Sequence, residues 1–198
     1  VVIALMFVYA GNHYVAYNQD ADSLLISYDS QKAESDLTFE DVKDDPTVRW
    51  IIDAYAIYVP FENGEYGELG GHSREDWDQE QVKEYLSDWW GITSRATATR
   101  TISQMLKKGT RASFETYLKK GYLSMDEDGY VYIISISEIP EDEQCRTWVC
   151  YDAYGHLDTR GVDAWDYVRI MRITGLCYQC GYISLEECLD QCLPIAQR

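Results

Sequence analysis

From Thr47 to the C-terminus, apolar residues recur at helical spacing in segments that end at glycine or proline. Val82 and Leu86, for example, lie four positions apart, as residues on one face of a helix do. Ser94 is suited to begin a helix, because its hydroxyl can accept a backbone N–H from the first turn, and Gly109 is suited to follow the end of that helix. The segments show no alternation of strands and helices that would build a parallel sheet. The pattern therefore predicts a mainly α, single compact multi-helix domain and excludes doubly wound nucleotide-binding folds.

The same pattern gives the positions of the expected elements. Residues 122–136 depart from it, because β-branched and aromatic residues flank Asp128-Gly129, a pair typical of a hairpin turn. We expect at most a small β-hairpin there, followed by an acidic loop that contains Cys145 and Cys150. Helices are expected near Thr38–Val42, over 47–59 with Pro60 ending the helix, from about Asp78 to Gly91, from Ser94 to Lys108, over 110–120 and 163–180, and from about Leu185 onward, where Ser184 and Glu187 form a capping box.

The N-terminal part of the chain differs from the rest. Val1–Ala10 is a continuous apolar run that is too short to span a bilayer and suits a buried helix or strand. Residues 17–47 are polar and acidic, as in a connector. We therefore divide the chain into residues 1–47, an apolar run and acidic connector packed on the domain, and residues 48–198, the helical domain. The expected location is cytoplasmic; the alternative is a membrane-anchored or exported protein, if Val1–Ala10 is an anchor or signal remnant.

The charge of the chain limits its partners. Acidic residues number 34 against 17 basic ones, a formal net charge of −17. Such an excess argues against nucleic acid and against strong binding to anionic membranes, because both need a cationic surface. Residues 91–125 reverse the balance, with one acidic and seven basic residues. This middle segment is expected to lie against its acidic flanks; the alternative is a positive face for an acidic partner.

Four short stretches occur in an order that resembles a known family. They are WWGITSR at 89–95, Gly109-Thr-Arg111, AWDYVR at 164–169 and GYISLEE at 181–187. Together they resemble the bacterial family known as domain of unknown function 1266, over roughly residues 48–198. The resemblance implies a helical domain without an established activity. The stretch from Tyr122 to Cys150 has no counterpart that we can place in the family.

Charged residues of these stretches form one candidate site. Asp166 and Arg169 lie three positions apart on one helix beside Trp165, and Arg95 and Arg111 lie near helix starts from which they could reach Asp166. As structure, this is a buried ion network that fixes helix register. As function, the guanidinium groups would bind a carboxylate or phosphate. We favour the structural interpretation.

The cysteines near the C-terminus form a second candidate site. Cys177 and Cys180 end one helix, and Cys188 and Cys192 lie four positions apart on the next. Four thiolates in a helical hairpin would suit zinc or an iron–sulfur cluster. The same spacing suits the buried faces of two packed helices, where cysteine behaves as a small apolar residue. We favour buried free thiols and assign no metal, with disulfide pairing and a metal site as the alternatives; Cys145 and Cys150 would suit a disulfide only in an oxidising compartment.

Catalysis has little support in the sequence. The three histidines, His13, His72 and His156, are remote from any recognisable nucleophile, and no catalytic residue is assigned. His72 with Glu68, Glu75 and Asp76 has two interpretations, a weak divalent-ion site and a solvated loop, and we favour the loop.

Two hypotheses for function follow from the sequence. The first is a non-enzymatic helical domain, without a cofactor, that binds a protein partner or a small anionic ligand through Arg95, Arg111 and Trp165–Arg169. The alternative is a metal-dependent or acid/base hydrolase of unknown substrate, which would use the acids around His72 or the cysteines.

Overall fold

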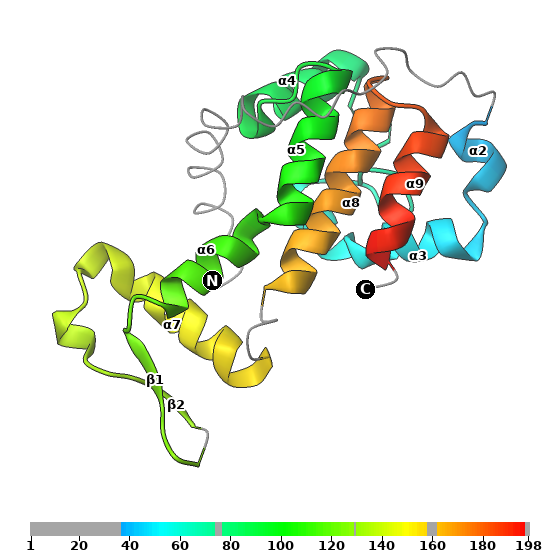
Figure 1. Ribbon diagram of the computed structural model, residues 1–198. Helices are drawn as coiled ribbons and strands as arrows, with labels where there is room; N and C mark the ends of the chain where they lie inside the picture. Colours follow the sequence, from blue (N-terminus) through cyan, green and yellow to red (C-terminus); the bar gives the residue numbers. More distant parts are fainter. Residues whose placement is uncertain (1–36, 74–76, 129, 158–161, 197–198) are drawn as a thin grey trace.

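Helices dominate the computed structural model, which describes residues 37–73, 77–128, 130–157 and 162–196 (Figure 1). This confirms the predicted mainly α class. The elements are α2 (Phe39–Val42), α3 (Pro46–Ala54), the 3₁₀ helix η2 (Ala56–Glu62), α4 (Gln79–Trp90), α5 (Arg95–Lys107), α6 (Gly109–Leu118), β1 (Leu123–Met125), β2 (Val131–Ile133), the 3₁₀ helix η3 (Ile136–Glu138), α7 (Glu141–Leu157), α8 (Asp163–Gln179) and α9 (Leu185–Ala196).

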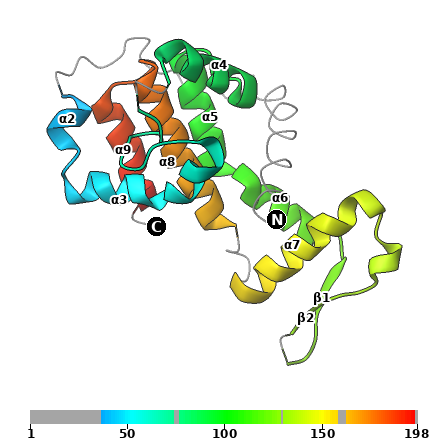
Figure 2. The same cartoon turned by 180° about the vertical axis from the view of Figure 1, so that it is seen from behind.

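The bundle is built around α8, which contacts α3, α4, α5, α6 and α9 (Figures 1 and 2). Every residue from Arg169 to Cys177 on this helix is buried. A helix that is buried on all sides cannot be strongly amphipathic, and its polar residues need partners inside the protein. This position of α8 brings Asp166, Arg169 and Arg172 into the interior.

Most helix ends lie where the sequence predicted them. Gly91 follows α4 with a left-handed backbone, φ 63°, and the side chain of Ser94 caps α5 by accepting the N–H of Thr97. At α9, Ser184 and Glu187 form the expected capping box, with Ser184 N–H to Glu187 Oε2 at 2.8 Å. These caps satisfy backbone groups that helix ends leave without intrahelical partners.

Pro60 does not end a continuous helix, contrary to the prediction. The α-helix α3 stops at Ala54, and the chain then continues as η2, with Pro60 inside it. Tyr55 at the junction is fully buried, and its hydroxyl donates to the carbonyl of Glu68 and accepts the N–H of Gly70. Periodicity alone could not find this break, because the apolar residues of both helices belong to the same core.

The part of residues 1–47 that the structure describes packs on the bundle. Thr38 precedes α2, which confirms the short helix expected there, and the side chains of Leu37, Phe39 and Val42 lie against the main core. The apolar run Val1–Ala10 lies outside the described residues. None of the described helices is long and apolar enough to cross a membrane.

Residues 109–157 form a hairpin unit that projects from the bundle and consists of α6, β1, β2, η3 and α7 (Figures 1 and 2). The predicted hairpin is confirmed: β1 and β2 pair antiparallel, with Ser124 opposite Tyr132, while Gly129 of its turn lies outside the described residues. Phe114, Tyr117 and Ile139 are buried in this unit but are not part of the main core cluster.

The acidic segment with Cys145 and Cys150 is the helix α7, so the predicted loop is wrong. Its apolar residues form no clear stripe, which is why periodicity missed it. Pro140 directly precedes three acidic residues in the first turn, a helix-start signal, and its carbonyl accepts the N–H of Glu143 at 2.8 Å.

Candidate functional site: a buried carboxylate between two arginines

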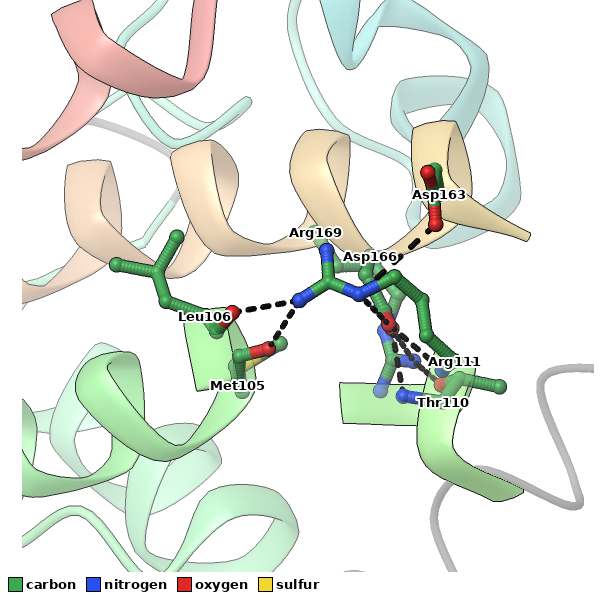
Figure 3. A network of polar contacts seen from close by, with 7 residues as sticks. All are labelled: Met105, Leu106, Thr110, Arg111, Asp163, Asp166 and Arg169. Carbon is green, nitrogen blue, oxygen red and sulfur yellow. Dashed lines mark hydrogen bonds and ion pairs between the residues drawn. The ribbon is translucent and has the colours of Figure 1, made fainter. Parts of the chain in front are cut away.

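The carboxylate of Asp166 lies in the first turn of α8 and points at the start of α6 (Figure 3). Its Oδ1 accepts the N–H of Thr110 and its Oδ2 the N–H of Arg111, each at 2.9 Å. Asp166 has no exposed surface. Lys108, the residue before α6, supplies no side-chain cap, so Asp166 caps this helix from a distant part of the sequence.

Gly109 allows the chain to pass directly over this carboxylate. A Cβ on Gly109 would lie 2.2 Å from Oδ2 of Asp166, and the residue has φ +51°. Only glycine combines this left-handed backbone with this approach at low cost. Gly109 therefore serves two purposes: it follows the end of α5, as predicted, and it admits Asp166 to the start of α6.

Arg111 joins the end of α5 to the start of α8. Its Nη2 donates to the carbonyls of Leu106 at 2.6 Å and Met105 at 3.2 Å, which have no partner further along α5. Its Nε lies 3.8 Å from Oδ2 of Asp166 and 3.9 Å from Oδ1 of Asp163. One guanidinium thus caps a helix C-terminus and faces two carboxylates (Figure 3).

Arg169 approaches the same carboxylate from the other side and is 5% exposed. Its Nη1 donates to the hydroxyl of Thr110 at 2.9 Å and lies 3.8 Å from Oδ1 of Asp166. Its guanidinium carbon lies 4.9 Å from the ring centre of Trp90 and 5.5 Å from that of Trp165. The two tryptophans cover the charge and exclude water from it.

Arg95, the remaining predicted member, lies elsewhere. Both of its terminal nitrogens donate to the two carboxylate oxygens of Glu187, the capping residue of α9. The structure thus brings Arg111, Trp165, Asp166 and Arg169 together, whereas Arg95 belongs to a separate pair. The start of α8 lies near the end of α5, because the two helices run antiparallel, so the start of α5 is far from Asp166.

The cysteines near the C-terminus are unpaired thiols in the core. Cys177, Cys188 and Cys192 have no exposed surface, and Cys180 is 4% exposed. Burial raises the pKa of Cys177 well above its usual value; contact with Cys192 and burial do the same for the pKa of Cys188. Within the described ranges, no three or more His, Cys, Asp or Glu side chains lie close enough together to hold a metal ion.

His72 is buried, which the sequence did not indicate. Its ring stacks on Trp77 with 3.8 Å between ring centres, and its Nε2 lies 3.4 Å from Nη2 of Arg172. The side-chain amide of Gln179 donates to the carbonyl of His72. The ion site considered for His72 with Glu68, Glu75 and Asp76 stays a prediction, because Glu75 and Asp76 lie outside the described part of the chain. The Gly70-Gly71 pair before His72 gave the only sequence signal of a tightly packed loop.

A second feature without a sequence prediction is the outer face of the hairpin, which consists of Tyr130, Tyr132 and Ile134. These residues alternate along β2 and its flanks, so their side chains leave the same side of the sheet. They are 72%, 47% and 57% exposed. Val131 and Ile133, between them, are partly buried, and α7 contacts β2.

The fold and the buried network of Asp166, Arg111 and Arg169 define a helical domain in which an aspartate of one helix, α8, caps the start of another helix, α6. The profile of a family described as proteins of unknown function, DUF1266, matches residues 85–198, more than half of the chain, so the chain belongs to that family. The match starts later than the expected 48 and its range includes the Tyr122–Cys150 stretch. No curated protein and no solved structure matched the chain.

Proposed function

We propose that this domain is a non-enzymatic protein-binding domain and that its binding surface is the outer face of the hairpin. The observation that carries the proposal is the exposure of Tyr130, Tyr132 and Ile134 side by side on a projecting unit. Aromatic residues are enriched in protein interfaces, where they provide a large contact area with little loss of side-chain freedom.

The arginine network supports a protein partner over a small anionic ligand. Two guanidinium groups and two helix N–H groups would suit an external anion, but Asp166 already occupies that position. A ligand would have to displace a fully buried carboxylate that two arginines face. We therefore assign the network a structural role, which is to set the direction of α6 and with it the position of the hairpin unit.

A hydrolase remains the second hypothesis, and no observation on the described residues favours it. His72, the histidine to which the sequence pointed, lies under Trp77 beside Arg172. The buried thiols carry raised pKa values, which lowers their thiolate fraction and hence their reactivity.

Capture of the partner tests the proposal. The full chain, immobilised, is exposed to a lysate of its source cells, and the captured proteins are identified by mass spectrometry. Each candidate is then purified and titrated against the wild-type chain and the variant Tyr132→Ser/Ile134→Ser. Binding to the wild type that weakens by about tenfold or more in the variant supports the proposal.

The matched control is Trp50→Ser, which removes a comparably exposed aromatic side chain from α3 in the bundle. This variant should bind like the wild type. Equal binding of the hairpin variant and the wild type by every purified partner would refute the proposal.

A further inference from the structure

The hairpin sheet has two strands, so each strand has an edge that no other described strand covers. Edge strands present a row of backbone N–H and C=O groups that can pair with an additional chain. Helix α7 packs closely against β2, whereas the close contacts of β1 are with β2. We therefore consider the edge of β1, Leu123–Met125, as the one that an added strand would use.

The pairing register shows which groups this edge offers. The N–H of Ile134 donates to Tyr122 and the N–H of Asp126 donates to Tyr130, both at 3.0 Å. In an antiparallel ladder, hydrogen-bonded pairs alternate with non-bonded pairs, so Ser124 bonds toward β2 while Leu123 and Met125 direct their N–H and C=O groups outward.

The neighbouring side chains indicate how an added strand would be recognised. Ser124 lies opposite Tyr132 on the outer face, and the Tyr132 side chain is 47% exposed beside this small residue. An added strand would extend the outer face and place every second side chain beside these residues.

The charge of the surroundings indicates the composition of that strand. Residues 119–157 contain eight acidic residues and three basic ones, and one of the basic residues, Lys120, pairs with Glu143. Exposed acids lie both at the turn, Asp126–Asp128, and at the start of α7, Glu141 and Asp142. A second copy of the chain would bring like charges together, whereas a lysine- or arginine-rich segment would be attracted.

We infer that the edge of β1 binds an extended basic segment of another protein by strand addition, in which lysine or arginine residues alternate with apolar ones. The inference rests on the proposed function and specifies its partner class and its binding mode. Backbone hydrogen bonds provide much of the affinity in this mode, and alternate side chains provide specificity.

The test uses a fluorescein-labelled peptide of alternating lysine and valine and the full-length protein. Fluorescence anisotropy should show binding, and the analogue with glutamate in place of lysine should bind at least about tenfold more weakly. Amide exchange followed by NMR then reports the mode. The N–H groups of Leu123 and Met125 should exchange freely in the free protein and at least about tenfold more slowly with peptide present.

A pair of variants provides an independent measurement. Met125→Pro removes one outward N–H and should weaken peptide binding, whereas Met125→Ala retains that N–H and should bind like the wild type. Proline is compatible with an edge position whose N–H faces solvent. Circular dichroism and thermal unfolding check that both variants are folded, and the exchange measurement on the wild type decides the outcome if the proline variant is not.

Each result has a distinct meaning. Peptide binding without slower exchange at Leu123 and Met125 would overturn strand addition and leave the proposed binding surface intact. Absence of binding at about millimolar peptide, or equal binding of the glutamate analogue, would overturn the basic partner. Formation of a dimer that protects the same two amides would overturn it in favour of a second copy. The proposed function itself fails only if the outer-face variant binds every purified partner as the wild type does.

Discussion

Gly109 lies against the carboxylate of Asp166 so closely that a Cβ at this glycine would be 2.2 Å from Oδ2. Two positions that are far apart in the sequence thereby depend on each other. The turn between α5 and α6 needs a glycine for its backbone conformation, and the buried aspartate needs the space that a glycine leaves.

We predict that Gly109→Ala lowers the free energy of unfolding by about 3 kcal/mol, since it adds a steric conflict to the cost of a left-handed alanine. Urea unfolding followed by circular dichroism measures this loss. Gly121→Ala is the control, because Gly121 has φ +80° but a Cβ there would contact nothing within 4 Å. That control should lose only about 1–2 kcal/mol. Equal losses in the two variants would contradict the close approach to Asp166.

Removal of the carboxylate itself should be more costly. Asp166→Ala leaves two helix N–H groups without their acceptor and removes the buried carboxylate that two guanidinium groups face, and we expect a loss of about 3–5 kcal/mol. Asp163→Ala is the control, because Asp163 is partly exposed and lies 3.9 Å from Arg111. It should lose less than about 1 kcal/mol.

The Asp166→Ala variant also allows a test of the site as an anion site. Acetate at about 0.1 M should raise the urea midpoint of the variant relative to chloride, because it binds the folded form alone. The wild type should show no such difference between the two salts. If the urea midpoint of the variant is the same in acetate and in chloride, the space left by the Asp166 side chain does not bind a carboxylate.

The Arg95–Glu187 pair should contribute measurably to stability. Both side chains are about one-fifth exposed, and both terminal nitrogens of Arg95 donate to the carboxylate. A double-mutant cycle with Arg95→Ala and Glu187→Ala should give a coupling free energy of about 1–2 kcal/mol. The exposed pair Lys83–Glu80 serves as the control and should give a clearly smaller coupling free energy, because water screens it. Coupling energies of the same size would argue against the special geometry of Arg95.

Alkaline pH should destabilise the protein. The pKa values of Cys177 and Cys188 are raised in the folded state from a usual value of 9.0, so the unfolded chain releases these protons first. Stability is therefore retained below pH 9 and lost as the pH rises above it, by at most about 1.4 kcal/mol per group and pH unit. Urea titrations between neutral pH and pH 10 measure the slope, and Cys177→Ala/Cys188→Ala should reduce it. A wild-type stability that is constant over this range would contradict the burial of the two thiols.

Helix caps, which depend on neighbouring residues, could be predicted from the sequence. Contacts that depend on the directions of the helices could not. Ser94, Gly109 and the Ser184–Glu187 box act within one or two turns, so their roles could be recognised locally. The partner of Arg95 could not, because it depends on the antiparallel course of α5 and α8. At 1.5 Å per residue, the two ends of α5 are roughly 20 Å apart, and Asp166 lies at only one of them.

Two local features were also missed for physical reasons. The helix α7 packs on a small sheet and on α6, so it needs no continuous apolar stripe, although Pro140 and the acids after it mark its start. The burial of His72 depends on the stacking of Trp77 and on Arg172 from α8. Neither contact has a signature in spacing or composition.

The hairpin unit buries apolar side chains of its own. Phe114, Tyr117 and Ile139 are buried there but lie outside the main core cluster, and the contacts around Asp166 join the unit to the bundle. We therefore expect the unit to open locally at a lower free energy than that of global unfolding. A bound strand would raise the free energy of this local opening. Binding of the partner would therefore order the hairpin unit before it affected the bundle.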